Sequence, residues 1–278
     1  MTQDIPNYFS RQEQIPWFSQ ENIRSLKIAI LGVGGIGCNI ALLASRLGFG
    51  KLILVDKDIV EPSNLNRQTL YSKEDIGQKK VIAAKTTLDN LDNLSSEVEA
   101  FHYDLFEDWQ KTIEIIKKSD YVMNGLDLPE IKRSLIGILC QKLGKPMIYC
   151  GTDPHSGYSG MILFQSSADD QPCYECLQAI LCSIKQLKLI EKYSQEHILS
   201  FKSINWRELE KKDYQALEGG ATTVLTAMMA SILAVNLVVQ DIHYQKCAHR
   251  IIFDLYSNNI ENYTLNKRVD CLVCGGIE

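Results

Sequence analysis

The sequence predicts an α/β fold: a mostly parallel sheet flanked by helices, with a smaller antiparallel extension near the C-terminus. Two observations predict it. Apolar runs that suit buried strands alternate with helical patterns through the first half of the chain, which is typical of a parallel sheet. The chain also has 278 residues, 45% hydrophobic and 23% charged, which is enough for one large core or two smaller ones.

The first half reads as a series of βαβ units. Each expected strand is a short aliphatic run, and each expected helix carries apolar residues at helical spacing. The expected strands lie at 26–33, 51–56, 98–103, 120–124 and 147–151. The expected helices between them lie at 35–47, 78–91, 109–117 and 129–143.

The second half changes character. A strand is expected at 160–165, and two short strands near 250–256 and 261–266 complete the chain. Residues 177–218 are rich in Lys, Glu, Gln and Ser, and we interpret them as a crossing segment or flap, with a solvated connecting helix as the alternative. We therefore divide the chain into an N-terminal helical arm at 1–25, a core at 26–165, and a C-terminal part of the same domain at 166–278.

Residues 221–239 carry no charge and approach the length of a membrane-spanning helix. Polar residues such as Thr226, Ser231 and Asn236 dilute the run, and no basic cluster flanks it. These features favour a helix packed inside protein, because helices that are apolar all round also occur in the cores of large domains.

The composition also bears on partners and location. The net charge of −5 offers no basic excess for a phosphate backbone, so nucleic acid is not an expected partner. Residues 1–17 contain acidic residues and prolines where a signal peptide needs a basic end and an apolar run. With nine cysteines, an odd number, we expect a cytoplasmic protein whose thiols are reduced.

A glycine-rich loop directly follows the first expected strand. Gly32, Gly34 and Gly37 form a G-x-G-x-x-G pattern that opens a helix, and Asp56 ends the second strand. Such glycines allow backbone N–H groups to approach phosphates, and a carboxylate about 20 residues later can bind ribose hydroxyls. The pattern predicts a Rossmann-like nucleotide site, and by itself it fits a dehydrogenase equally well.

The residues after Asp56 distinguish these readings. They run D-K-D-I-V-E-P-S-N-L-N-R-Q over 56–68, followed by G-Q-K-K at 77–80. A redox cofactor does not need Asn64, Arg67 and Lys80 beside its phosphates. A triphosphate that is split at its α-phosphorus does need them, because fixed cations reduce the repulsion between anionic groups.

Together these motifs resemble the ThiF/MoeB/HesA family, the bacterial branch of the ubiquitin-activating enzyme superfamily. The resemblance covers nearly the whole chain and includes Ser10-Arg11-Gln12 before the first strand. It implies a homodimeric adenylyltransferase that uses ATP and magnesium to adenylate the C-terminal carboxylate of a small ubiquitin-like sulfur carrier protein ending in Gly-Gly. The alternatives are adenylation of a short ribosomal peptide or a tRNA-linked carboxylate, and a non-catalytic nucleotide-binding partner subunit.

The resemblance also implies roles for individual residues. Asp127 would hold magnesium, although Leu126 and Leu128 stand where the family commonly has polar residues. Arg11 would reach the ATP of the neighbouring subunit. The implied catalytic residues are Arg11, Arg67, Lys80 and Asp127. The implied nucleotide-binding residues are Gly32, Gly34, Gly35, Gly37, Asp56, Asp58, Asn64, Arg67, Gln68 and Lys80.

Four cysteines form two CxxC pairs that match the zinc pairs of the family: Cys173, Cys176, Cys271 and Cys274. Four thiolates can complete a tetrahedral zinc site without an open position for water or substrate. We therefore expect a structural four-cysteine zinc site that ties the C-terminus to the middle of the chain.

A catalytic cysteine is missing from the position where many relatives carry one. Residues 216–223 contain Gly219 and Gly220 and no thiol. A covalent relay through this segment is therefore not expected. Cys182 is the nearest substitute in sequence, and its apolar neighbours favour a packed thiol over a nucleophile. The cysteines expected in the core are Cys38, Cys140, Cys150 and Cys247.

Overall fold

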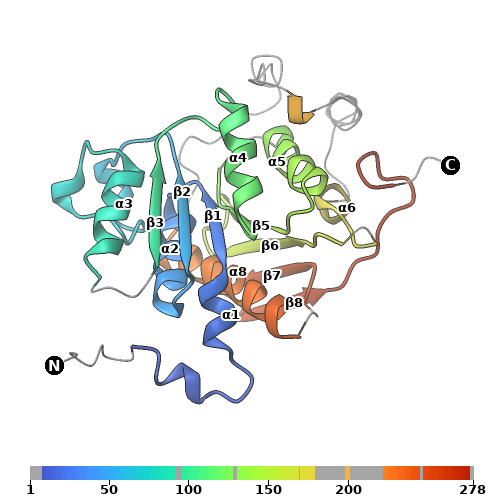
Figure 1. The fold of residues 1–278 in the computed structure, drawn as a ribbon, viewed down its shortest axis with the longest axis horizontal. Helices are drawn as coiled ribbons and strands as arrows, with labels where there is room; N and C mark the ends of the chain where they lie inside the picture. Colours follow the sequence, from blue (N-terminus) through green and yellow to red (C-terminus); the bar gives the residue numbers. More distant parts are fainter. Residues whose placement is uncertain are drawn as a thin grey trace.

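The computed structural model of the chain describes residues 8–91, 96–127, 130–168, 170–178, 198–200, 222–244 and 247–275. Within these residues an eight-stranded sheet runs through the molecule with helices on both of its faces (Figure 1). The fold class predicted from the sequence is confirmed.

The sheet has the strand order β3-β2-β1-β4-β5-β6-β7-β8. The parallel strands are β1 (Lys27–Leu31), β2 (Lys51–Val55), β3 (Glu97–Phe101), β4 (Tyr121–Asn124) and β5 (Met147–Thr152). The antiparallel strands are β6 (Ser159–Gln165), β7 (Arg250–Asp254) and β8 (Asn259–Tyr263). Strands from the C-terminal part of the chain thus extend the sheet of the core.

The last strand lies two to three residues earlier than expected, at Asn259–Tyr263 instead of 261–266. The difference arises in the turn after β7. The Asp254 side chain accepts the Tyr256 N–H at 2.8 Å, and Asn258 adopts a positive φ of 54°. A left-handed residue allows the chain to reverse at once, so β8 pairs with β7 directly after the turn.

The α-helices fill the intervals predicted for the first half and add short elements elsewhere. They are α1 (Gln20–Ser25), α2 (Gly35–Leu47), α3 (Lys80–Asp89), α4 (Trp109–Lys118), α5 (Glu130–Lys142), α6 (Tyr174–Gln178) and α8 (Val224–Tyr244). Short 3-10 helices lie at η1 (Gln12–Gln14), η2 (Pro62–Asn64), η3 (Lys73–Asp75) and η4 (Ile198–Ser200).

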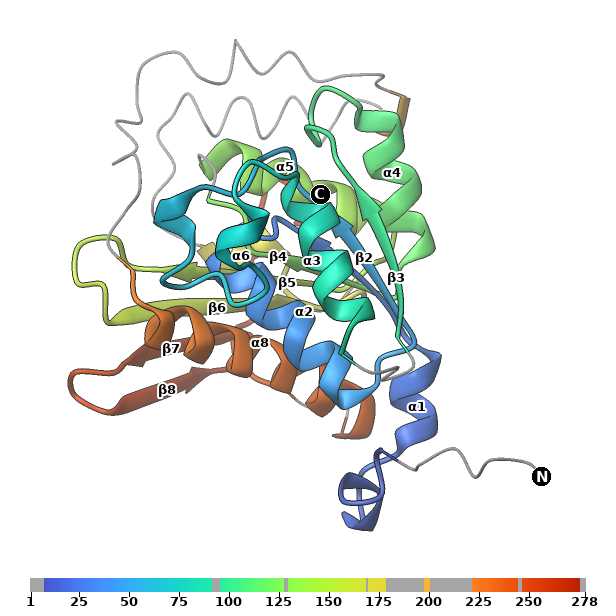
Figure 2. The same ribbon diagram turned by 90° about the vertical axis from the view of Figure 1, so that its left-hand side faces the viewer.

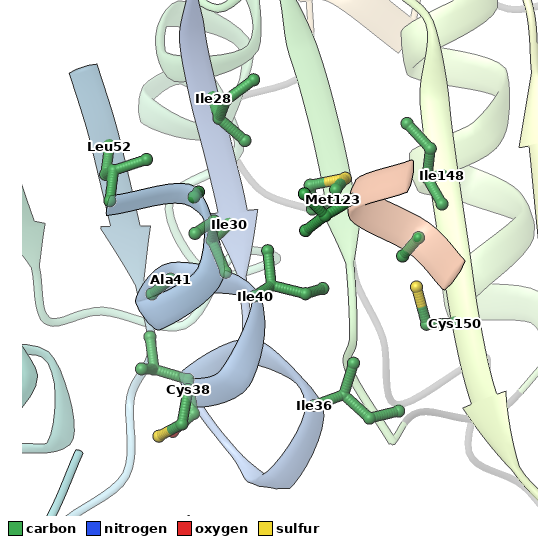
Figure 3. Close-up of a cluster of buried hydrophobic side chains, with 14 of the residues drawn as sticks. Ile28, Ile30, Ile36, Cys38, Ile40, Ala41, Leu52, Met123, Ile148 and Cys150 are labelled. Atoms are coloured by element: carbon green, nitrogen blue, oxygen red, sulfur yellow. The ribbon is translucent and has the colours of Figure 1, made fainter. Parts of the chain in front are cut away.

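The core has two layers because successive residues of a strand point to opposite faces of the sheet. Ile28 and Ile30 of β1 pack with α2, α3 and α8 on one face, whereas Ala29 and Leu31 pack with α4 and α5 on the other. Figure 3 shows Ile28 and Ile30 with Ile40 of α2 in the first layer. Covering both faces is what a parallel sheet requires.

Within the described residues, α8 is long and apolar enough to span a membrane by length and composition. Half of its most apolar stretch is buried inside the protein, however, where α8 packs against α2, β5 and β6. In Figure 2 it lies along α2 beside the antiparallel end of the sheet. The buried half of this apolar stretch is therefore part of the core, in agreement with a helix packed inside protein.

Candidate active site

A cavity of about 470 Å³ opens at the carboxyl ends of the parallel strands. Its walls include Gly32 after β1, Asp56 after β2, Gly125 after β4 and Gly151 of β5. β1 and β4 are neighbours, but the helices that follow them cover opposite faces of the sheet. Open α/β sheets bind ligands in the crevice that forms at such a reversal of strand order.

The glycine loop joins β1 to α2 at the edge of this cavity. A Cβ on Gly37 would lie 1.8 Å from the Gly32 carbonyl oxygen, so only glycine fits there. A Cβ on Gly34 would meet nothing within 4 Å, and Gly34 lines the cavity with Gly35. Because Gly34 precedes α2 without a capping side chain, N–H groups of the first helical turn are available to an anion.

Asp56 is held by backbone groups on two sides. Its Oδ2 accepts the Val33 N–H at 2.7 Å, and its Oδ1 accepts the Asp58 N–H at 2.8 Å. The side chain is buried and lines the cavity. Burial raises the pKa of Asp56, and the positive charge of Lys80 opposes that rise. Each oxygen still has a second lone pair, so Asp56 can accept a ribose hydroxyl while it holds the loop.

Cationic and polar groups predicted for a triphosphate line the same cavity. Lys80, the first residue of α3, is buried, and its Nζ lies 3.1 Å from Asp58 Oδ2. Arg67 donates from Nη1 to the Ser63 carbonyl at 2.8 Å, which holds its guanidinium near the end of η2. Gln68 is buried beside it. The structure thus brings Asp58, Arg67, Gln68 and Lys80 together with the glycine loop.

Asn64, expected beside the triphosphate, does not line the cavity. It is buried, and its Oδ1 accepts the Glu61 N–H at 3.0 Å within the η2 turn. This contact shapes the turn that carries Arg67. A direct triphosphate contact by Asn64 stays a prediction.

Arg11 is exposed and lies far from the cavity of its own chain. Gln12, which follows it, donates to the carbonyl of Leu47 at 3.0 Å, and Leu47 ends α2. α2 begins at the cavity and has 13 residues, a length of about 19 Å. Figure 2 shows the described residues before α1, drawn in dark blue, below α1 and away from the sheet.

Asp127 follows β4 and contributes an exposed side chain to the cavity wall. The turn before it is shaped by Asn124, whose buried Oδ1 accepts the Leu126 N–H at 3.3 Å. Proteins commonly bind magnesium through one or two carboxylates together with phosphate oxygens of the substrate. A carboxylate on the wall of the cavity that the glycine loop also lines fits this donor chemistry.

Several cavity residues were not predicted as site residues by the sequence analysis, among them Lys132, Arg133 and Tyr149. The Lys132 ammonium lies 5.4 Å from the ring centre of Phe106. The Arg133 guanidinium lies 5.0 Å from the ring centre of Tyr149 and donates to its hydroxyl. The sequence did contain a signal for Lys132 and Arg133. They are adjacent basic residues in the first turn of the helix that follows the carboxyl end of β4, where ligand-binding residues are expected.

The four CxxC cysteines meet in one cluster, as predicted. Their Sγ atoms all lie within 4.8 Å of one another, with separations of 3.5 Å for Cys173 and Cys271 and 3.4 Å for Cys176 and Cys274. Sulfurs of a tetrahedral zinc site are about 3.8 Å apart when the Zn–S bonds are about 2.3 Å. The cluster therefore has the donor set and the spacing for zinc.

Among the remaining cysteines, Cys38, Cys140 and Cys150 are buried, and Cys247 is partly buried. Burial raises the pKa of the Cys38 thiol to about 12, which keeps it protonated. Cys182, Gly219 and Gly220 lie outside the described residues.

Comparison with known proteins identifies relatives along the chain. A sulfur carrier protein adenylyltransferase of Thermus thermophilus is 25% identical over 260 residues, covering 92% of this chain and 84% of the relative. An adenylyltransferase and sulfurtransferase, UBA4 of Candida albicans, is 32% identical over 172 residues. That match covers 60% of this chain and 38% of the relative, so the chain spans well under half of its length.

The fold resembles solved structures of E. coli MccB. The structure of MccB with ATP has a TM-score of 0.70 and 22% identity, covering 98% of this chain and 75% of that one. The structure with AMPCPP and MccA has a TM-score of 0.74 and 20% identity, covering 99% and 76%. The ThiF family model matches residues 9–273, which include all the residues that line the cavity and three of the four cysteines of the cluster. The chain belongs to the ThiF family.

Proposed function

We propose that this protein uses ATP and magnesium to adenylate the C-terminal carboxylate of a small ubiquitin-like sulfur carrier protein ending in Gly-Gly. The observation that carries the proposal is one cavity that unites the glycine loop with Arg67, Lys80 and Asp127. The relative named a sulfur carrier protein adenylyltransferase, matched over most of both chains, supports the choice of substrate.

The reaction joins a carboxylate oxygen of the carrier to the α-phosphorus of ATP. The bond from that phosphorus to its bridging oxygen breaks, and pyrophosphate leaves. Both reactants are anionic, so the residues must chiefly offset charge repulsion and fix positions. Arg67 and Lys80 place cations beside the phosphates, and the loop N–H groups bind phosphate oxygens.

Magnesium, held by Asp127, would neutralise charge on the leaving pyrophosphate. No side-chain base is required, because the attacking carboxylate is ionised at neutral pH. Asp56 orients the nucleotide through its ribose hydroxyls.

We also propose a homodimer in which Arg11 of one copy completes the site of the other. Arg11 lies beyond the end of α2 that is remote from its own cavity. The α8 helix, meanwhile, leaves the side chains of Leu225 and Ile232 63% and 46% exposed along one stripe. Burying this apolar stripe against a second copy of the chain would be energetically favourable. In the proposed dimer, the N-terminal arm of the second copy, which carries Arg11, would then approach the cavity of the first.

The cysteine cluster serves structure in this proposal. With four thiolates, the zinc has no open position for substrate, so it would cross-link α6 to the C-terminal segment without taking part in adenylation.

A short peptide is the second candidate substrate. The fold matches MccB, solved with AMPCPP and MccA, over nearly the whole chain. A non-catalytic role is less well supported, because the cavity keeps both the cations and Asp127.

The test is ATP–pyrophosphate exchange with purified protein. A carrier protein ending in Gly-Gly should support magnesium-dependent exchange, and the same carrier lacking its last two residues should not. Exchange with short peptides alone would select the second candidate. Exchange with neither substrate, together with tight nucleotide binding, would favour the non-catalytic role.

A further inference from the structure

The peptide groups around Val33, in the middle of the glycine loop, are fixed by side chains from two other segments. Its N–H donates to Asp56 Oδ2 at 2.7 Å. Its carbonyl oxygen accepts the Tyr71 hydroxyl at 2.7 Å and the Cys38 thiol at 3.3 Å. Val33 is fully buried, and Cys38 and Tyr71 are also buried, so water does not compete for these bonds.

The Tyr71 bond determines where the next N–H points. In a trans peptide the C=O and N–H bonds point in opposite directions. The carbonyl of Val33 turns inward to Tyr71, so the N–H of Gly34 turns away from Tyr71. Gly34 lines the cavity, and the space beside its Cα is open. The inward hydrogen bond of Val33 therefore directs the Gly34 N–H outward.

Both donors to this carbonyl remain protonated at neutral pH. Burial raises the pKa of Tyr71 far above its usual value and the pKa of Cys38 to about 12. The hydroxyl bond is shorter than the thiol bond, and a thiol is the weaker donor. Tyr71 is thus the principal donor to the carbonyl.

The segment that carries Tyr71 also supplies cavity residues. Arg67 and Gln68 line the cavity, and Thr69 donates to Asn39 Oδ1 at 2.8 Å. Asn39 in turn donates to the Gly35 carbonyl at 2.7 Å. Two hydrogen-bonded links, through Thr69 and through Tyr71, therefore hold this segment in register with the glycine loop.

We infer that the Tyr71 hydroxyl is a positioning group for nucleotide binding: it fixes the Val33 carbonyl so that the Gly34 N–H is aimed at a phosphate of the bound nucleotide. Tyr71 acts through the loop and does not touch the ligand. The inference rests on the proposed nucleotide binding, and it assigns a role to a residue just beyond the run that the sequence analysis related to the triphosphate.

The test compares a ligand with phosphates to one without them. Tyr71→Phe removes only the hydroxyl and keeps the buried ring. The affinity for AMPCPP should fall about 5- to 10-fold, as expected for one lost hydrogen bond to a backbone group. The affinity for adenosine should stay within about twofold, because the bond positions a phosphate contact. Isothermal titration calorimetry measures both affinities.

The matched control is Tyr121→Phe. Tyr121 has the same 8% exposure as Tyr71, and its hydroxyl donates to Asp241 away from the cavity. This variant should bind both ligands as the parent does. Cys38→Ala, which removes the weaker donor, should show a smaller loss confined to AMPCPP, and it provides the same test if Tyr71→Phe does not fold.

Parent-like AMPCPP affinity in folded Tyr71→Phe would overturn the inference alone. Where Tyr71→Phe does not fold, parent-like AMPCPP affinity in Cys38→Ala would overturn it. Equal losses for AMPCPP and adenosine would also overturn it, since they would indicate a general packing role. Absence of AMPCPP binding by the parent protein would overturn the proposed function together with the inference.

Discussion

Tyr174 and Tyr149 meet edge to face, with ring centroids 5.7 Å apart. Tyr174 directly follows Cys173 of the cysteine cluster, and Tyr149 lines the cavity. Gly137 of α5 allows this approach, since a Cβ there would lie 2.7 Å from the Tyr174 Cβ. The cysteine cluster is therefore linked by side-chain packing, through Tyr174 and Tyr149, to one wall of the candidate active site.

Removing one cluster thiolate should therefore affect both stability and the site. In Cys271→Ser, the zinc content measured by mass spectrometry should fall well below that of the parent, and the thermal midpoint should drop by at least about 5 °C. ATP–pyrophosphate exchange should weaken as the Tyr149 wall loosens. Cys247→Ser, outside the cluster, is the control and should retain its zinc. A parent protein without bound zinc would contradict the prediction.

Removing the proposed magnesium ligand should abolish most of the chemistry. Asp127→Ala should lower ATP–pyrophosphate exchange by about 100-fold or more, because the carboxylate holds charge that acts in the transition state. The thermal midpoint should change little, since the side chain is exposed. Asp89→Ala, which removes an exposed carboxylate paired with Lys85 on α3, should exchange at the parent rate. Parent-level exchange by Asp127→Ala would exclude this residue as the magnesium ligand.

Mixing two inactive variants tests the contribution of Arg11 across the interface. Subunits with Arg11→Ala and subunits with Asp127→Ala should each be nearly inactive as homodimers. A mixed dimer contains one site in which both residues are intact, so exchange should recover to about a quarter of the parent rate in an equal mixture. Native mass spectrometry checks that mixed dimers form. If they form and ATP–pyrophosphate exchange does not recover, Arg11 acts within its own chain or not at all.

Two glycines of the loop should respond oppositely to the same substitution. Gly34→Ala should fold with nearly parent stability, because a Cβ at this position meets no atom within 4 Å. Its affinity for AMPCPP should nevertheless fall at least about 10-fold, because the methyl group enters the space of the ligand. Gly37→Ala should destabilise the fold itself, because its Cβ would lie 1.8 Å from the Gly32 oxygen. Denaturant unfolding and calorimetry measure the two effects. Unchanged nucleotide binding by Gly34→Ala would remove the loop from the proposed site.

Nucleotide affinity should decline as the pH is lowered through the titration of Asp56. Burial raises its pKa from the ordinary 3.8, so the carboxylate is neutralised at a higher pH than an exposed aspartate. The neutral acid is a weaker acceptor for the Val33 N–H and for ribose. Asp56→Asn should bind AMPCPP weakly with a flatter pH profile in this range. If AMPCPP affinity depended on pH in the same way in the parent and in Asp56→Asn, the titrating group would be one other than Asp56.

The same shift has a defined sign for stability. The folded state holds the Asp56 proton more tightly than the unfolded chain does. Protonation of this group therefore stabilises the fold, and the contribution is fully present at pH values below 3.8, the ordinary pKa. That contribution is lost as the pH rises through the folded pKa. Other interactions must therefore offset the cost of the buried charge at neutral pH, among them the two N–H bonds and the cation of Lys80.

The sequence determined the local elements and the identity of the cavity's main residues. Helix α2 begins and ends where the pattern predicts, because glycine marks both ends: Gly34 precedes it, and Gly48 follows with a φ of 82°. The alternation of strands and helices required the carboxyl ends of the parallel strands to meet at one edge. The motifs that follow those strands therefore met in one cavity.

Only the tertiary structure decided which polar residues face that cavity. Asn64 and Arg67 belong to one motif, yet Asn64 caps its own turn and Arg67 lines the cavity. Lys132 and Tyr149 lie in unrelated segments and carry no motif, but the packing of α5 on β5 brings both to the wall. The position of Arg11 beyond the end of α2 likewise depends on a tertiary contact, the hydrogen bond from Gln12 to the carbonyl of Leu47. Sequence spacing specifies which side chains share an element, whereas the direction in which each side chain points depends on the elements packed around it.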